Sequence, residues 1–469
     1  MDSAMVSAQW KVRPSLDPPR AGVWLGAGGA ETEGVWLGSL AEVVPGKQPA
    51  VWLSTGKEQV VAVVGKRGSG KSFTLGVIAE GLASGTDTQL GRQERPRAVL
   101  LFDPLDVYWT TRYPVAASAN TEAQRHYDLA QAAGLPQLDF DVRAWVPGGR
   151  RDADPDWFDT LRLSVPGMGL EEWELLLDTN AMSEPMGQAL ADALSLVRSS
   201  GYHRQGKSVS ASPSFSVADL IDAAQSDELG ASYHTESLRA LRQRLSALDG
   251  TGLFSAAGTT LQELLAPGRL SVVLLGRLSQ SYRAAVVAIL TRMLIDQRNT
   301  TAFAEKRLAL DPELASEDRD RVAALAEGGT PRTVVVLDEA QSFLAPGPRS
   351  PARDVFVRLV KEGRNMGLSA VLATQQPSAL DQRVLSQVET FLAHQLVTEA
   401  DIRAVRDNLK SETPDGIQFG SQQLDFSGLL RQLPAGVCLV SAADVNTVVR
   451  RAMVARVRPR ATVHGGIEL

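Results

Sequence analysis

Residues 60–82 contain the sequence pattern that is most informative about the fold. An apolar run from Val60 to Val64 is followed by Gly65-Lys66-Arg67-Gly68-Ser69-Gly70-Lys71-Ser72, and a helical pattern then continues to Leu82. Glycines let the backbone curl until successive N–H groups face one concavity, and a helix that begins there adds the positive end of its dipole. Strand, glycine-rich turn and helix in this order predict a loop that holds a polyphosphate mainly through the main chain.

The polar residues of this loop have distinct predicted tasks. Lys71 is expected to reach the β- and γ-phosphates, and the Ser72 hydroxyl is expected to coordinate Mg²⁺. An accidental glycine turn is the structural alternative, but the flanking strand and helix argue against it. We therefore expect ATP and Mg²⁺ as cofactors. The residues predicted to bind the nucleotide are Gly65, Gly68, Ser69, Gly70, Lys71 and Ser72.

A pair of carboxylates follows a second apolar run. Residues Val334 to Leu337 are apolar, and Asp338 and Glu339 come directly after them. Asp338 is predicted to accept a hydrogen bond from Mg²⁺-bound water and so to orient the metal, whereas Glu339 is placed to polarise an attacking water. The alternative is a solvated Asp-Glu turn. A glutamate beside the metal aspartate favours hydrolysis by water over phosphoryl transfer to a metabolite.

Polar residues beside a third, largely apolar run are candidates for sensing hydrolysis. The run from Ser369 to Ala373 ends at Thr374, and Gln375 and Gln376 come next. If this strand lies beside the acidic one, either glutamine can touch the γ-phosphate or the attacking water, and we assign this role to Gln375. Arg364 precedes the run, and we predict that it supplies positive charge to the γ-phosphate of a neighbouring subunit. An ordinary surface arginine is the alternative.

Strand and helix patterns alternate through the second half of the chain. Short apolar runs recur with helical stretches between them, which predicts an α/β fold with a mainly parallel sheet buried on both faces. By contrast, residues 111–260 are mostly helical in pattern, and residues 1–50 suggest a few short strands. The apolar runs in the second half are 270–275, 333–337, 369–373, 391–396 and 437–440.

Charge and cysteine content exclude several classes of protein. The formal net charge is −6, so nucleic acid cannot be held by a generally basic surface and needs a local basic stripe or a pore. Cys438 is the only cysteine, which excludes an internal disulfide and cysteine-cluster metal sites. No window reaches the roughly 18 consecutive apolar residues of a membrane-spanning helix, and the first twenty residues lack the core of a signal peptide. We expect a cytoplasmic protein without a membrane segment.

Together, the motifs resemble the HerA branch of the HerA/FtsK ATPases over roughly residues 50–469. The resemblance implies a RecA-like P-loop core over residues 56–110 and 261–469, with a mostly helical insertion over 111–260. The family usually begins with a longer β-barrel, so residues 1–55 are expected to form a short β-rich, reduced barrel-like segment. The stretches that match are the phosphate loop, Leu337-Asp338-Glu339-Ala340, Glu362-Gly363-Arg364-Asn365-Met366-Gly367, Ala373-Thr374-Gln375-Gln376-Pro377 and Arg458-Pro459-Arg460-Ala461-Thr462-Val463-His464-Gly465-Gly466.

The same resemblance implies a ring, usually a hexamer, that couples ATP hydrolysis to movement along double-stranded DNA. Relatives commonly work with a separately encoded nuclease or other effector, in DNA processing or antiphage defence. Two stretches depart from the family pattern. Thr374-Gln375-Gln376-Pro377 replaces the usual Ser-Gln-Arg-Pro, and Asp103-Pro104-Leu105-Asp106 matches only the opening of the usual Asp-Pro-His-Gly.

Two further sets of arginines have predicted contacts. The segment from Val445 to Ile467 carries five arginines and no acidic residue. The resemblance implies that it packs against the adjacent subunit near the nucleotide, where Arg458 or Arg460 would share or replace the role of Arg364; a basic tail on a sheet edge is the alternative. DNA phosphates can be tracked by arginines on loops that face a channel, and the candidates are Arg349 and Arg353.

Two other functions compete with the translocase. In the first, ATP binding organises a ring that serves as an assembly scaffold for an effector enzyme, and translocation is not needed. The net negative charge and the short N-terminal segment support this alternative. In the second, the chain is a DNA or protein pump of the conjugation and secretion type, although such pumps commonly carry membrane segments.

Overall fold

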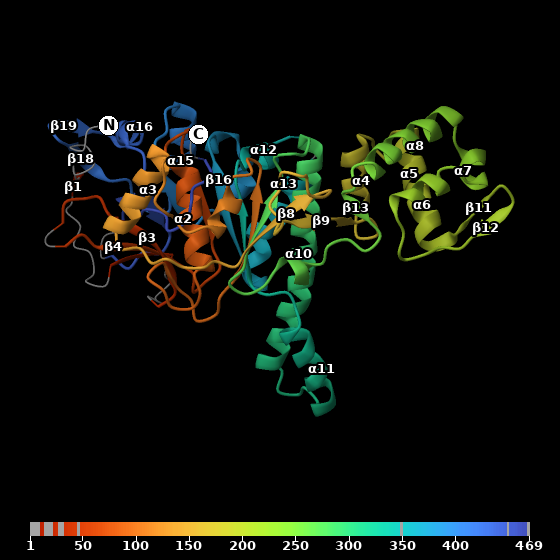
Figure 1. Ribbon diagram of the computed structural model, residues 1–469, viewed down its shortest axis with the longest axis horizontal. Coiled ribbons are helices and arrows are strands. Elements are labelled where there is room, and N and C mark those ends of the chain that lie inside the picture. The colour runs from red at the N-terminus through yellow and green to blue at the C-terminus, as the bar shows by residue number, and fades with distance from the viewer. Residues whose placement is uncertain are drawn as a thin grey trace.

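A single large β-sheet organises the chain (Figure 1). The computed structural model describes residues 10–13, 22–26, 32–44, 47–347, 350–447 and 450–466. Within these residues the sheet has 14 strands in the order β2-β4-β3-β21-β20-β17-β5-β16-β15-β7-β14-β8-β9, with β6 beside β3. The α/β fold predicted from the alternating pattern is confirmed.

The middle of the sheet is parallel and fully buried. Its strands pair in parallel from β17 through β5 to β9, and their apolar runs leave almost no side chain exposed, as expected for strands covered on both faces. The parallel strands are β17 (Thr390–Ala393), β5 (Val60–Val64), β16 (Leu368–Thr374), β15 (Thr333–Leu337), β7 (Ala98–Asp103), β14 (Leu270–Leu274), β8 (Val142–Pro147) and β9 (Asp159–Leu161).

The remaining strands extend one edge of the same sheet. β20 pairs antiparallel with β17, β21 with β20, β3 with β21 and β4 with β3. The reduced barrel-like segment expected over residues 1–55 is corrected for β2, β3 and β4, which continue the main sheet because the C-terminal strand β21 supplies a partner for β3. In contrast, β1 (Lys11–Arg13) pairs with β18 (Asp415–Phe419) in a separate sheet. The strands are β20 (Val437–Ala442), β21 (Met453–Val457), β3 (Gly34–Leu40), β4 (Ala50–Ser54), β2 (Val23–Leu25) and β6 (Gly91–Arg92).

Helices cover both faces of the sheet and give two separate cores. One face packs against α2 (Lys71–Ala83) and α3 (Thr121–Ala132). The other packs against four helices, which are α10 (Gln280–Leu310), α13 (Pro351–Glu362), α15 (Glu399–Asn408) and α16 (Phe426–Gln432). The second half of α10 runs beyond the sheet and pairs with α11 (Ser316–Glu327) to form a projecting helical hairpin (Figure 1).

The insertion expected over residues 111–260 is helical only in part. β8 and β9 fall inside this range but lie in the main sheet, because the apolar run of β8 pairs with β14. The helical part begins near α4 and lies at the end of the molecule opposite β4 (Figure 1). It contains α4 (Leu170–Leu177), α5 (Pro185–Ser195), α6 (Val217–Ala223), α7 (Asp227–Ser232), α8 (Thr235–Asp249), the π-helix η2 (Leu196–Ser200), and the hairpin of β11 (Tyr202–Arg204) and β12 (Lys207–Val209).

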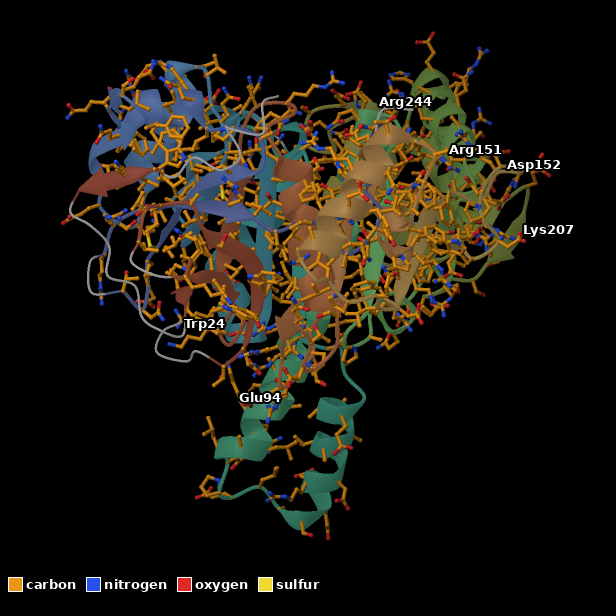
Figure 2. All side chains as sticks on the ribbon, turned by 60° about the vertical axis from the view of Figure 1, so that its left-hand side comes forward. Trp24, Glu94, Arg151, Asp152, Lys207 and Arg244 are labelled. Atoms are coloured by element: carbon orange, nitrogen blue, oxygen red, sulfur yellow. The ribbon has the colours of Figure 1, made fainter. Side chains whose placement is uncertain are left out.

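One helix of the insertion shows how its core is built. Leu238, Leu241, Leu245 and Leu248 of α8 are all buried on one face. Arg244 lies off that face and donates to the Asp178 carbonyl at 2.7 Å, so it caps the neighbouring helix α4. Figure 2 shows Arg244 and the hairpin residue Lys207 on the side of the molecule away from Trp24 of β2.

Short elements complete the described chain. None of the described helices is long and apolar enough to cross a bilayer. The short elements are β1 (Lys11–Arg13), η1 (Tyr108–Arg112), β10 (Leu163–Ser164), β13 (Phe254–Ser255), α9 (Leu261–Leu264), α12 (Gln341–Leu344), η3 (Gly363–Met366), η4 (Pro377–Ala379), α14 (Gln382–Leu385), β18 (Asp415–Phe419) and β19 (Gln422–Leu424).

Candidate nucleotide site

The carboxyl ends of β5, β15 and β16 bring the predicted site residues to one edge of the sheet. The three strands are parallel, and Thr374 at the end of β16 pairs with Val64 at the end of β5. The phosphate loop follows β5, Asp338 follows β15 and Gln375 follows β16. Residues from three distant parts of the chain therefore meet at one edge, which is where open α/β sheets bind ligands.

The loop after β5 has a conformation that only glycine tolerates at three positions. Gly65, Gly68 and Gly70 have φ values of 156°, 75° and 108°, a region that other residues rarely adopt. A Cβ on Gly65 would lie 2.6 Å from Ser69 Oγ and 2.7 Å from His394 Cβ. Gly70 is the N-cap of α2 and offers no side-chain cap. The first N–H groups of α2 are thus open to an anion, as phosphate binding requires.

Lys71 is a buried cation beside two carboxylates. Its side chain is on the first turn of α2, and the residue is only 5% exposed. Burial lowers the pKa of Lys71, while the charges of Glu339 and Asp338 act in the opposite direction. Within the described residues its ammonium group has no hydrogen-bond acceptor. An ammonium group without an acceptor at the mouth of an anion-binding loop suits a polyphosphate.

Asp338 is fully buried and held by two donors. The Tyr108 hydroxyl donates to Asp338 Oδ2 at 2.8 Å, and the Glu339 N–H donates to Oδ1 at 2.8 Å. Burial raises the pKa of Asp338 because the charged form is desolvated. A divalent cation would compensate that cost, and the carboxylate of Asp338 with the hydroxyl of Ser72 is the hard-oxygen set that Mg²⁺ prefers. The residues present therefore fit the predicted metal.

Glu339 is clamped by amide groups. Gln375 Nε2 donates to Glu339 Oε1 at 2.6 Å, and Gln341 Nε2 donates to Oε2. Gln341 is itself fixed, because Thr374 Oγ1 donates to its Oε1 at 2.7 Å. Glu339 has φ 50°, a left-handed conformation that costs free energy in a residue with a side chain. The structure thus brings Glu339 and Gln375 together, as a water-activating base and a hydrolysis sensor would require; their roles stay predictions.

Arg364 does not belong to the site of its own chain. It lies on η3 before β16, and its side chain is exposed. Seven residues of strand separate it from the carboxyl edge, which is roughly 20 Å of extended backbone. No arginine side chain spans that distance. The predicted action in trans on a neighbouring subunit remains a prediction that this placement permits.

The prediction that Arg458 or Arg460 contacts an adjacent subunit is wrong, because both arginines lie in the core of their own chain. Both are buried against α2, where Arg458 Nη1 donates to Glu80 Oε2 at 2.8 Å and Arg460 Nε donates to Oε1 at 3.0 Å. Burial alone would raise the pKa of Glu80, but the two guanidinium groups hold it below its ordinary value. The tail after β21 crosses α2 of its own chain, so these arginines cannot serve an adjacent subunit.

The candidate DNA contacts receive no support. Arg353 is 4% exposed and donates to the Gly347 carbonyl at 2.6 Å. Its guanidinium group also lies 3.6 Å from the carboxylate of Asp381. It therefore stabilises the start of α13 instead of reaching into a channel. Arg349 lies outside the described residues.

Three side chains at this edge were missed from the sequence. Tyr108 contacts Asp338, and Gln341 contacts Glu339. His394 follows β17 beneath the phosphate loop, where its Nε2 lies 2.8 Å from Thr74 Oγ1 and its Nδ1 lies 3.1 Å from the Val437 carbonyl oxygen. Burial lowers the pKa of His394 to about 4, so it is neutral. Of the three, only Tyr108 could have been suspected from the sequence, because Asp103, at the strand end Asp103-Pro104, lies five residues before it.

Known proteins share parts of this sequence and fold. The family model described as the central domain of helicase HerA matches residues 58–294. The DNA double-strand break repair helicase HerA of Pyrococcus furiosus is 24% identical over 178 residues, which are 36% of this chain and 32% of that protein. A probable helicase of Methanocaldococcus jannaschii is 29% identical over 86 residues, 18% of this chain and 16% of that protein. The chain thus aligns with about a third or less of these relatives' length.

Two solved structures align with most of this chain at low sequence identity. VirB4 of Thermoanaerobacter pseudethanolicus has a TM-score of 0.49 at 14% identity, covering 90% of this chain and 96% of that chain. The plasmid coupling protein TrwB, in complex with ADP and Mg²⁺, has a TM-score of 0.46 at 14% identity, covering 93% of this chain and 99% of that chain.

Proposed function

Because this chain belongs to the family of the helicase HerA central domain, we propose that it is a ring-forming ATPase that moves along double-stranded DNA. Its family makes it a P-loop nucleoside triphosphatase. The observation that carries the proposal is the convergence of the phosphate loop, Asp338 and the Glu339–Gln375 pair at one sheet edge. This arrangement contains every group that water attack on a γ-phosphate needs from one subunit.

Each residue has a proposed task in hydrolysis. The N–H groups of the loop and Lys71 hold the phosphates of ATP, while Ser72 and Asp338 would hold Mg²⁺. When bound, Mg²⁺ would neutralise charge on the phosphate oxygens. Glu339 accepts a proton from the attacking water, and the Gln375 amide keeps the Glu339 carboxylate aimed. When ATP is hydrolysed to ADP and phosphate, Gln375 is placed to transmit the loss of the γ-phosphate to the rest of the subunit through β16.

A ring is proposed because Arg364, the arginine predicted to contact the γ-phosphate, cannot reach the nucleotide site of its own chain. Arg364 lies near the amino end of β16, whereas the nucleotide site lies at the carboxyl ends of the strands. We therefore propose that it acts on another subunit. Arg364→Ala should assemble normally yet lose about a thousandfold in hydrolysis, the scale of an arginine acting in trans. Arg319→Ala, an exposed arginine on α11, is the control. Unchanged turnover by Arg364→Ala in an assembled ring would remove Arg364 from the mechanism.

The test of the whole proposal is the ATPase rate with and without linear duplex DNA, with Lys71→Ala as the blank. The HerA relative is named as a DNA double-strand break repair helicase, so strong stimulation by duplex DNA is expected here. Displacement of a third strand from a DNA triplex would then demonstrate movement. Hydrolysis that ignores DNA would contradict translocation.

An assembly scaffold is the second candidate function. The net charge of −6 favours it, and the buried Arg353 is not available to DNA. In this case, ATP binding organises a ring that holds a nuclease or another effector enzyme. A stable complex with an effector that requires ATP but not DNA would support the scaffold. We propose an effector partner in either case, in DNA processing or antiphage defence.

A further inference from the structure

The helical insertion contains an open groove with polar and basic walls. It lies between α6 and α8 and has a volume of about 420 Å³. No task in the proposed hydrolysis uses the residues of this groove. They are Arg239, Arg242, Gln243 and Ser246 of α8 and Ile221 and Gln225 of α6.

The two arginines of the groove have guanidinium groups that the fold leaves open. Arg239 is exposed and has no hydrogen-bond acceptor or ion-pair partner among the described residues. Arg242 Nε donates to the Leu238 carbonyl at 3.3 Å, but its Nη groups have no acceptor in the part of the chain that the structure describes. Residues three apart are neighbours on a helix surface, so both charges act on one stretch of the groove. By contrast, Arg244 of the same helix is engaged by the Asp178 carbonyl.

The acidic residues around the groove do not neutralise its arginines. Asp222 of α6 accepts from the Tyr202 hydroxyl at 2.9 Å and pairs with Arg204. Glu236 and Asp249, near the two ends of α8, do not line the groove, and in the described structure they form no ion pair with its arginines. The groove therefore keeps two positive charges, although the chain as a whole has a net charge of −6.

The chemistry of the groove fits the sugar–phosphate backbone of duplex DNA. A guanidinium group binds a phosphate through two parallel hydrogen bonds, and amide and hydroxyl side chains also donate to phosphate oxygens. Ile221 is the only apolar residue among those that line the groove, so the lining offers little to an apolar side chain. Binding of the DNA backbone needs no such pocket, because its affinity comes mainly from neutralised phosphates.

The groove lies toward the side of the molecule that carries the nucleotide site. Figure 1 shows α8 on the same upper side as α12, which follows the carboxyl end of β15, whereas α11 projects from the opposite side. Figure 2, turned about the vertical axis, also shows Arg244 of α8 on the upper side. A duplex bound along α8 would therefore lie toward the edge of the sheet where ATP is bound.

We propose that the groove between α6 and α8 binds the phosphate backbone of double-stranded DNA, with Arg239 and Arg242 as the phosphate contacts. The proposal rests on the proposed function, because duplex DNA is the substrate of the translocase. It places the contacts elsewhere than the sequence-based candidates Arg349 and Arg353. Phosphate contacts carry no sequence information, so the groove should hold duplexes of any sequence.

The test measures binding of a fluorescently labelled duplex to the full chain by anisotropy, over a series of salt concentrations. The variant combines Arg239→Ala with Arg242→Ala. Each lost phosphate contact should lower the slope of log K against log salt by about 1, so the variant should lose about 2 for each subunit on the DNA. Its affinity at about 0.1 M salt should fall by about tenfold or more. Its ATPase rate without DNA should match the wild type, since neither arginine lies in the nucleotide site.

The matched control combines Arg319→Ala with Arg321→Ala. It removes the same charge from two exposed arginines of α11, where Arg321 pairs with Asp318, and it should bind DNA like the wild type. A second variant replaces both groove arginines with lysine. It should recover most of the lost slope, because an ammonium group still binds phosphate as a point charge. Thermal melts of all variants verify folding.

Three results would overturn the proposal. The first is unchanged affinity and slope in the groove variant, and the second is an equal loss in the α11 control. The third uses polyglutamate as a probe for an acidic protein partner: if the groove variant loses binding of polyglutamate but not of duplex DNA, the groove serves a protein. A wild type that binds no duplex DNA would instead overturn the proposed function, so the two failures are distinguishable.

Discussion

Two charged clusters lie on the same helix, α2, and differ in how far the fold satisfies them. Near its C-terminal end, Glu80 accepts from Arg458, Arg460 and the Thr462 hydroxyl and from two main-chain N–H groups. At its start, Lys71 has no hydrogen-bond acceptor among the described residues and faces carboxylates that belong to other elements. Both clusters are buried, but only the first is closed by the chain itself.

The contrast separates structural charges from functional ones. A buried charge that is fully paired contributes to a unique fold and has no capacity left for a ligand. A buried charge that lacks partners destabilises the fold, and it is retained where a ligand supplies the missing partners. Arginine count alone does not make this distinction, which is why the C-terminal arginines attract a functional interpretation in the sequence. Variants that alter one cluster at a time should therefore separate effects on stability from effects on hydrolysis.

The largest effect is expected from Lys71→Ala. Because Lys71 is the buried cation for the phosphates, hydrolysis should fall by about a thousandfold, comparable to loss of a preorganised electrostatic contact. The melting temperature should stay the same or rise, since a buried charge is removed. Lys66→Ala, in the same loop but exposed, should retain activity. ATPase assays and thermal melts of both variants are needed, and near-normal hydrolysis by Lys71→Ala would contradict the comparison.

Glu80→Gln should have the opposite profile. Removing the carboxylate leaves Arg458 and Arg460 buried without their counter-charge, so the free energy of unfolding should fall by about 3–5 kcal/mol. Turnover per folded molecule should change by less than about twofold, because no substrate contact is lost. Denaturant titration and ATPase assays provide the measurements, with exposed Glu122 as the site of a control Glu→Gln change. A loss of turnover at unchanged stability would place Glu80 in the active site.

His394 offers a test by pH because it lies beneath the loop with both ring nitrogens partnered. Its pKa is about 4 in the fold and about 6.5 unfolded. The contribution of neutral His394 to the free energy of unfolding is thus fully present above pH 6.5. About 3 kcal/mol of this contribution is lost as the pH falls toward 4. His394→Gln should flatten the dependence of unfolding free energy on pH over this range, whereas His203→Gln, at an exposed histidine, should not. Parallel curves for the wild type and His394→Gln would refute this assignment.

The smallest effect is expected from Gln375→Ala. The variant loses one of the two amides that clamp Glu339, so kcat should fall by about ten- to thirtyfold while KM for ATP changes little. The neighbouring exposed residue Gln376 supplies the control, Gln376→Ala, which should stay near the wild type. Equal losses in both variants would show that the strand end, and not the Gln375–Glu339 contact, matters.

Local pattern was sufficient to predict the parallel core and the residues at its carboxyl edge. β5, β15 and β16 coincide with apolar runs, and neighbouring parallel strands bring the residues at their carboxyl ends to one edge of the sheet. The pairing of Glu80 with Arg458 could not be predicted in the same way, because 378 residues separate them. Only the return of β21 to the sheet brings the two together.

Two other features depended on tertiary context. β8 joins the sheet although its surroundings are helical in pattern, because β14 offers it a buried edge. Tyr108 reaches Asp338 only because Asp103 and Asp106 fix the loop between β7 and η1. Sequence spacing predicts which residues share a helix or strand, but it does not predict which distant elements a loop will contact.

The most direct measurement of the central claim is single-turnover hydrolysis of radiolabelled ATP by Glu339→Gln. Glutamine keeps the shape of the side chain but cannot take a proton, so the account predicts wild-type ATP binding with hydrolysis slowed by about a hundredfold or more. Glu362→Gln, at an exposed carboxylate paired with Arg358, should hydrolyse normally. Rapid turnover by Glu339→Gln would show that the Glu339–Gln375 edge is not where water attacks ATP.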